Sequence, residues 1–220
     1  MTPDPRAPLG VGDHYRTARG RIDELIRSVD ATAWDTPVPT CPGWRVRDVL
    51  GHLVGIIEDA DAGRLSGPPT TEQTEEEVDR HRDDDPIDLL ATWSEIAPGF
   101  EAGISATARW PAVLDVVSHE HDIRGAVHRE AADSDDVELT GTLLAEWIRA
   151  PLEIDLGHRV VRSGTGAAEL RLRTTAFEVL RFRMGRRTRD QVRAYDWSAD
   201  PEPVLDDLFV FGPAVSPISY

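Results

Sequence analysis

The segment VLDVVSHEHDIRGAV, residues 113–127, carries an acid and a histidine that an α-helix would place one turn apart. Asp115 and His119 stand at positions i and i+4, and Asp122 follows at i+7, so a helix would align all three on one face. A carboxylate and an imidazole one turn apart can hold the same cation. The segment therefore predicts two ligands of a divalent metal, and a third must come from elsewhere.

His52 is the best candidate for the third ligand. It lies at the edge of the apolar stripe of residues 46–57 and is flanked by Gly51 and Gly55, which allow another helix to approach closely. Three protein ligands leave positions open for water or substrate, as in catalytic rather than structural metal sites. A surface ion pair or an ordinary hydrogen-bonded histidine fits the same spacing, so both alternatives stay open at this point.

Two further residues could act at the edge of such a site. Asp122 could orient His119 or Arg124, and Arg124, five residues after His119, could pair with a substrate carboxylate. An interhelical or surface ion pair is an equal alternative for each. Cys41 and Trp44 lie in a proline-rich turn and are interpreted as packing residues, with a nucleophile or thiolate ligand just before a helix N-terminus as the alternative for Cys41. The remaining histidines, expected to be mostly exposed and given no role, are His14, His81, His121, His128 and His158.

The elements that must position these residues are predicted to be helices. Apolar periodicity and breakers predict helices over residues 13–29 with Asp13 as N-cap, from 46 onward, from Pro86 to about residue 98, over 111–127, and over 139–156 with a kink or break at Pro151. The charged stretch within residues 67–85 is interpreted as a solvated connector, with a short solvated helix as the alternative. Residues 170–173 alternate like a strand, whereas residues 177–184 suit a helix.

Composition limits the class of protein. The chain has 220 residues, 40% of them hydrophobic, and no apolar run long enough to span a membrane. A net charge of -16 argues against nucleic acid as a partner. The single cysteine fits a reducing compartment, and the N-terminal MTPDPRAPLGVGDHYR lacks the pattern of a signal peptide. A cytoplasmic protein without membrane or nucleic-acid partners is expected.

Two motifs carry a resemblance to a known family. TCPGWRVRDVLGHLVG, followed some sixty residues later by VLDVVSHEHDIRGAV, resembles the mycothiol-dependent maleylpyruvate isomerase family of the DinB-like superfamily. The resemblance extends from about residue 13 to 156, and the tail piece TTAFEVLRFRMGRRTRDQVRAYDWSADPEP is also similar. It implies a mainly α fold with a DinB-like four-helix bundle over residues 1–160. A small C-terminal subdomain over residues 161–220, of helix with room for a short strand, would pack on the bundle.

The resemblance also implies a ligand set. In the family, a histidine from the second helix and a Glu/Asp-x-x-x-His pair from a later helix bind a divalent metal, commonly zinc, and His52, Asp115 and His119 occupy those positions. The founding pattern has glutamate where this chain has Asp115, whose side chain is shorter by one carbon–carbon bond, about 1.5 Å. Two imidazoles and one carboxylate also suit iron or manganese, so zinc is a preference.

The activity implied by the resemblance uses mycothiol as a thiol cosubstrate. The open metal position would lower the pKa of the thiol, and the thiolate would attack an electrophilic carbon. This predicts a divalent-metal-dependent isomerase or S-transferase that acts on a small electrophilic substrate. The alternative is a non-catalytic metal-binding module of the same fold with a binding or regulatory role. A metal-free helical scaffold is the third possibility.

Overall fold

The computed structural model describes residues 9–220, so the first half of the segment interpreted as lacking a signal peptide lies outside the described residues. The chain forms two compact units, of which one ends at Glu130 and the other spans Ala131–Tyr220. The boundary between these compact units lies about thirty residues before the predicted domain boundary at residue 160. The predicted division into domains 1–160 and 161–220 stays a prediction. None of the helices described is both long and apolar enough to cross a membrane.

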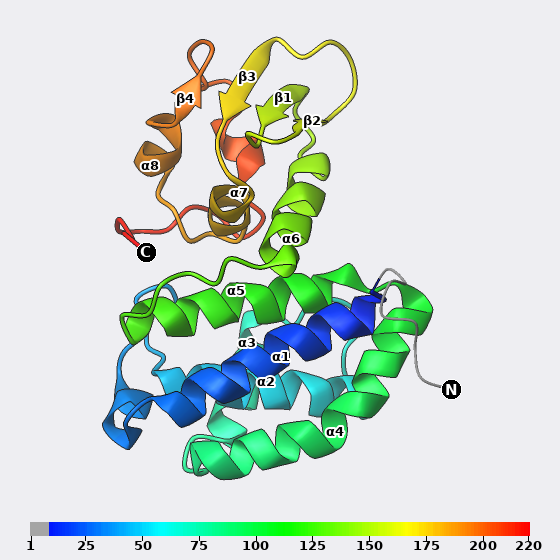
Figure 1. Ribbon diagram of the computed structural model, residues 1–220, viewed down its shortest axis with the longest axis vertical. Coiled ribbons are helices and arrows are strands. Elements are labelled where there is room, and N and C mark those ends of the chain that lie inside the picture. Colours follow the sequence, from blue (N-terminus) through cyan, green and yellow to red (C-terminus); the bar gives the residue numbers. More distant parts are fainter. Residues whose placement is uncertain (1–8) are drawn as a thin grey trace. The chain divides into compact units, whose positions relative to one another are not determined.

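From residue 9 onward, the regular elements of the first unit are all helices (Figure 1). Its elements are α1 (Val11–Ser28), the 3₁₀ turn η1 (Ala31–Asp35), α2 (Val46–Asp61), α3 (Thr71–Arg80), α4 (Pro86–Thr107) and α5 (Trp110–Ala126). Helix α1 packs on α4 and α5, while α2 packs on α3, α4 and α5. The four long helices therefore enclose a common apolar core, and the short α3 covers one side of α2.

Two helix boundaries in this unit differ from the prediction. The first helix begins at Val11, and Asp13, predicted as its N-cap, lies in the first turn, where its carboxylate accepts a hydrogen bond of 3.0 Å from the Gly10 N–H. The helix predicted to end near Pro98 continues to Thr107 and bends midway along its length (Figure 1). Proline removes one helical hydrogen bond, but burial of Ala97 and Ile104 on either side stabilises the continuation.

The charged stretch before Pro86 is a helix, so its interpretation as a connector is wrong. Thr70 caps α3 by accepting a hydrogen bond from the Gln73 N–H, and the Gln73 side chain accepts one from the Thr70 N–H in return. Most of α3 is exposed, yet Glu77 and Val78 are buried. The short solvated helix, the alternative left open by the sequence, is the closer description.

The second unit combines short helices with a small sheet. Its elements are α6 (Asp135–Glu146), β1 (Leu152–Asp155), β2 (Val160–Arg162), β3 (Leu170–Arg173), α7 (Ala176–Arg183), α8 (Arg189–Arg193), β4 (Asp196–Trp197) and the 3₁₀ turn η2 (Leu205–Leu208). The strand order is β2-β1-β3-β4, with β1 and β3 parallel and the outer pairs antiparallel. Mainly helical structure with strand in the C-terminal part is confirmed.

The helix predicted over residues 139–156 is wrong in its second half. Helix α6 begins at Asp135 and ends at Glu146, and strand β1 follows Pro151. Proline has no N–H to donate to a helix, and it disfavours helical geometry in the residue before it. Beyond it, Leu152 and Ile154 alternate with polar residues and are buried, which is the pattern of a strand with one covered face.

A partly buried acid in α7 makes the second unit sensitive to low pH. Burial raises the pKa of Glu178, but hydrogen bonds from Arg187 and Tyr195 outweigh it and hold this pKa below its ordinary value. A depressed folded-state pKa stabilises the fold above the ordinary value, and this contribution is lost as pH falls through the folded-state pKa. Glu178→Gln should therefore lower the free energy of unfolding at pH 7 by about 1–3 kcal/mol.

Urea denaturation followed by circular dichroism at pH 7 and below pH 4 measures this difference. The gap between wild type and Glu178→Gln should narrow as the wild-type carboxylate becomes protonated. Glu169→Gln, at an exposed position of the same unit, makes the same change in charge and should leave stability nearly unchanged. A gap that stays constant down to acid pH would contradict the assignment to Glu178.

Candidate metal centre

Helix α2 starts where the proline-rich turn ends, and this start fixes the position of His52. The Asp48 carboxylate accepts a hydrogen bond of 2.7 Å from the Arg45 N–H, which caps the first turn. The apolar residues after it are fully buried against the neighbouring helices: Val49, Leu50, Leu53 and Val54. His52, predicted to lie at the edge of this stripe, is itself buried.

The structure brings His52, Asp115 and His119 together. Nε2 of His52 lies 3.6 Å from Oδ2 of Asp115, and Nε2 of His119 lies 3.5 Å from Oδ1 of the same carboxylate. One candidate ligand atom from each of the three residues lies within 4.8 Å of the other two. Both histidines are buried, whereas the Asp115 side chain is 27% exposed, so the carboxylate forms the solvent side of the cluster.

Each histidine is held from behind by a second, fully buried carboxylate. Nδ1 of His52 lies 2.7 Å from Oε2 of Glu77, and Nδ1 of His119 lies 3.1 Å from Oδ2 of Asp122. The exposed fraction of both acidic side chains is 0%. A carboxylate that accepts the Nδ1 proton fixes the ring orientation and leaves Nε2 free to bind an ion. Both imidazoles therefore direct Nε2 toward Asp115.

Glu77 is the site residue that sequence reasoning missed. It reaches His52 because α3 lies against α2 at two glycines: a Cβ on Gly55 would lie 2.8 Å from the Glu77 Cβ, and one on Gly51 would lie 3.0 Å from the His81 Cβ. Neither position has room for a side chain without a shift of α3. The flanking glycines predicted a close helix contact. The helix that makes this contact could not be recognised, because Glu77 stands in an acidic stretch whose composition is typical of a solvated surface.

The surroundings of His52 favour positive charge. Burial alone lowers the pKa of this imidazole, but the hydrogen bonds to Asp115 and Glu77, and the charges of both carboxylates, outweigh burial and raise the pKa to about 9. Two carboxylates thus stabilise a cation at this point, even though the imidazole itself is buried. The same electrostatics would favour a bound metal ion.

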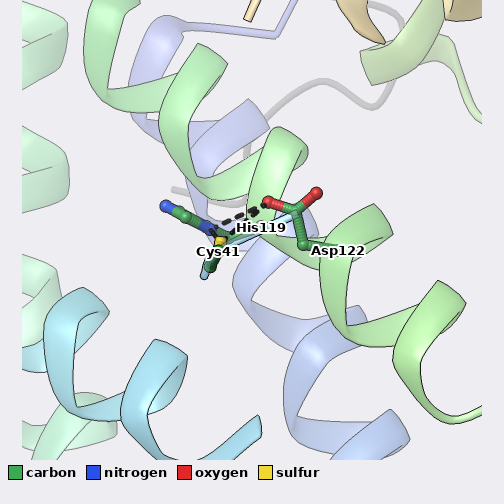
Figure 2. Close-up of side chains that lie close together, drawn as sticks. All are labelled: Cys41, His119 and Asp122. Atoms are coloured by element: carbon green, nitrogen blue, oxygen red, sulfur yellow. Dashed lines mark hydrogen bonds and ion pairs between the residues drawn. The ribbon is translucent and has the colours of Figure 1, made fainter. Parts of the chain in front are cut away.

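The turn before α2 adds two residues to the surroundings of the histidines. The Trp44 ring lies 5.3 Å from the His52 ring and 6.2 Å from the His119 ring, between centroids. The Cys41 sulfur lies 3.9 Å from Nδ1 of His119 and 3.7 Å from Oδ2 of Asp122 (Figure 2). The sequence assigned both residues to packing, and the structure places both beside the candidate ligands.

Asp122 and Arg124 occupy different faces of α5. Asp122 contacts His119, which fits the orienting role predicted for it. Arg124 instead donates to Glu120 at 3.0 Å, one turn back, and Arg21 of α1 binds the same carboxylate at 2.7 Å. The structure therefore places Arg124 in an interhelical ion-pair cluster, the alternative left open for it. Of the histidines expected to be mostly exposed, His14 and His121 are buried.

The donor set fits a divalent ion. Ligand atoms that bind zinc tetrahedrally at about 2.0–2.2 Å are separated from one another by roughly 3.3–3.5 Å. The distances of 3.5 and 3.6 Å from the two Nε2 atoms to Asp115 come close to this separation. The shorter aspartate side chain therefore still reaches between the two imidazoles, and its exposed side leaves room for further ligands.

Comparisons with known proteins identify the family and the fold of the chain. The family model described as the mycothiol maleylpyruvate isomerase N-terminal domain matches residues 15–131, a range that includes every residue of the cluster. Two solved structures, of the mycothiol-dependent maleylpyruvate isomerase and of a histidine-to-alanine mutant of it, are similar at a TM-score of 0.50 and 12% identity. Each match covers 80% of this chain and 88% of that chain, and at this identity it shows the fold. No curated protein sequence matches significantly.

Proposed function

The chain belongs to the family of the mycothiol maleylpyruvate isomerase N-terminal domain, and from this premise we propose that it is a metal-dependent enzyme that uses mycothiol. The reaction is an isomerisation or an S-transfer on a small electrophilic substrate. One observation carries the proposal: within the matched residues, Nε2 of His52 and Nε2 of His119 converge on the carboxylate of Asp115. Buried histidines with this orientation and a partly exposed acid suit a catalytic ion with open positions.

In the proposed site, His52, Asp115 and His119 hold the ion, with zinc preferred. When bound, the ion would act as a Lewis acid and lower the pKa of a thiol, so that the thiolate exists at neutral pH. Glu77 accepts the Nδ1 proton of His52, and the Asp122 carboxylate lies 3.1 Å from Nδ1 of His119, so an acid supports each imidazole on the side away from the ion. Asp122 is therefore proposed as a positioning residue rather than as a group that reacts with substrate.

The open side of the proposed site lies at Asp115. It is the most exposed of the three proposed ligands, so thiol and electrophile enter past its carboxylate. A contact between Arg124 and a substrate carboxylate stays a prediction. It requires the guanidinium either to break its ion pair with Glu120 or to bind both carboxylates at once. The ion pair favours a structural role for this arginine, which holds α5 through the carboxylate that also binds Arg21.

The proposed partners are small molecules. A strongly acidic chain offers no basic footprint for nucleic acid, and the family points to mycothiol and a small electrophile. We place the protein in the cytoplasm, where a low-molecular-weight thiol stays reduced and a single cysteine has no disulfide to form.

The test is turnover that requires the thiol. Zinc-loaded protein should convert maleylpyruvate, or form a thioether with a simple electrophile, when mycothiol is present and should do neither when the thiol is omitted. The metal-free protein, with the same thiol, should be inactive. Bound metal together with no heat of mycothiol binding in calorimetry would contradict the proposal and favour a non-catalytic metal-binding module.

A further inference from the structure

A second group of donor atoms lies on the far side of His119. Figure 2 shows Cys41, His119 and Asp122 with their side chains turned toward one another. The Cys41 sulfur lies 3.9 Å from Nδ1 of His119 and 3.7 Å from Oδ2 of Asp122, and these nitrogen and oxygen atoms are 3.1 Å apart. The three donors thus form a compact triangle on the Nδ1 side of the ring.

The size of this triangle matches a metal position. Zinc binds thiolate at about 2.3 Å and imidazole or carboxylate at about 2.0–2.2 Å, so tetrahedral donors are separated by roughly 3.3–3.7 Å. Shifts of a few tenths of an ångström would bring the observed separations to these values. We propose that Cys41, His119 and Asp122 form a second metal position, which shares His119 with the first and takes a thiophilic divalent ion.

The backbone holds the donors of this position in place. In the turn before α2, the Cys41 N–H donates to the Val38 carbonyl and the Trp44 N–H donates to the Cys41 carbonyl, each at 2.9 Å. These bonds fix the turn on both sides of the thiol. Asp122 is fully buried in α5, one turn after His119. The thiol is half-buried, so an ion can enter past Cys41 without unfolding the helix.

The two positions use opposite nitrogens of one imidazole. Nε2 of His119 faces Asp115, and Nδ1 faces Cys41 and Asp122. A neutral imidazole has one nitrogen with a free lone pair, so a neutral His119 serves one position at a time. Thiolate selects soft ions, whereas the histidine and carboxylate set also accepts harder ones. The chain therefore sorts ions by softness between two positions that compete for His119.

The experiment uses the single cysteine of the chain as its reporter. Cobalt(II) and cadmium(II) are titrated into metal-free, full-length protein, and the near-ultraviolet thiolate-to-metal charge-transfer absorption is recorded. Since Cys41 is the only thiol, such a band can arise from no other residue. Wild type should show the band, and Cys41→Ser should lose it. Wild-type protein alkylated at Cys41 should also show no band. This control is needed because a substitution at Cys41 could lose the band by misfolding.

Three further variants separate the two positions. His52→Ala and Asp115→Ala damage only the first position and should keep the band, whereas Asp122→Asn should weaken it. No band in wild type at saturating cadmium overturns the proposal. A band lost in His52→Ala would assign Cys41 to the first position, and a band unchanged in Asp122→Asn would exclude Asp122 from the second; either result overturns the proposed ligand set. No mycothiol or substrate is present, so the outcome is independent of the proposed function.

Discussion

Replacement of His119 by alanine is expected to reduce bound divalent metal from about one equivalent to background, because the variant keeps only two of three protein ligands. Thiol-dependent turnover should fall by more than about a hundredfold, beyond the effect of losing a residue that only orients a ligand. The physical reason is the place of this ring between Asp115 and Asp122, with Nε2 at 3.5 Å from one carboxylate and Nδ1 at 3.1 Å from the other. Plasma mass spectrometry of natively purified protein measures the metal.

The matched control is His158→Ala. This histidine is exposed in the second unit and pairs with Glu138 at 2.9 Å, so its loss should change neither metal content nor turnover. Full metal retention in His119→Ala would remove this residue from the ligand set. Absence of metal in wild type, persisting after reconstitution with zinc, iron and manganese, would leave a helical scaffold and withdraw the enzymatic proposal.

Glu77→Gln is expected to weaken metal affinity by about 10- to 100-fold, the usual cost of losing a carboxylate that supports a ligating histidine. The glutamine oxygen can still accept the Nδ1 proton of His52, so the substitution removes mainly the charge. That charge is fully buried 2.7 Å from the imidazole, where solvent screens it little, and its loss lowers the basicity of the ring. Competition with a chromophoric chelator gives the affinity.

Glu76→Gln provides the comparison, because it removes the same charge from the neighbouring, exposed position of α3. Its metal affinity should stay within about twofold of wild type, since exposed charges are screened. Equal losses in both variants would mean that the general negative field of α3, and not the contact with His52, supports the ion. Equal affinity of Glu77→Gln and wild type would exclude Glu77 from the site.

The proposed ligands could be chosen from the sequence for two different reasons, because α2 is strongly periodic whereas α5 is buried on nearly every side and offers only the spacing of its acid and histidine. The apolar stripe after Val46 fixes which face of α2 is buried, and the i, i+4 spacing places Asp115 and His119 on one face of α5. Helical periodicity does not predict that these two faces pack against each other, because that contact belongs to the tertiary structure. The family resemblance supplied it, and the structure shows the three side chains together.

Asp122 could be predicted as a supporting residue because it shares α5 with His119, but Glu77 and Cys41 could not be found in this way. Glu77 stands in a run of acids, and nothing in its own segment distinguishes it from Glu75 or Glu76. Its burial depends on the missing side chain at Gly55, in another helix. Cys41 was assigned to packing for a similar reason, since its neighbours His119 and Asp122 are about eighty residues further along the chain.

Two prolines account for two helix boundaries that were predicted wrongly: one helix continues past Pro98, and another ends before Pro151. Pro98 was predicted to end a helix, yet tertiary burial of Ala97 and Ile104 carries α4 past it. Pro151 was tolerated in a predicted helix, yet the chain changes there to a strand with buried Leu152 and Ile154. Local preference is a free-energy difference of a few kcal/mol, and the buried partners on each side decide the outcome.

The distance along the chain between α2 and α5 gives the proposed ion a second effect. An ion bound by His52 and by Asp115 or His119 cross-links two helices that the intervening α3 and α4 separate in sequence, and so closes a long loop without a covalent bond. Because an ion that binds only the native state adds its binding free energy to that of folding, the melting temperature of this unit rises with the concentration of free metal. The persistence of the folded protein in the cell then follows the supply of the ion, quite apart from the reaction that the ion serves.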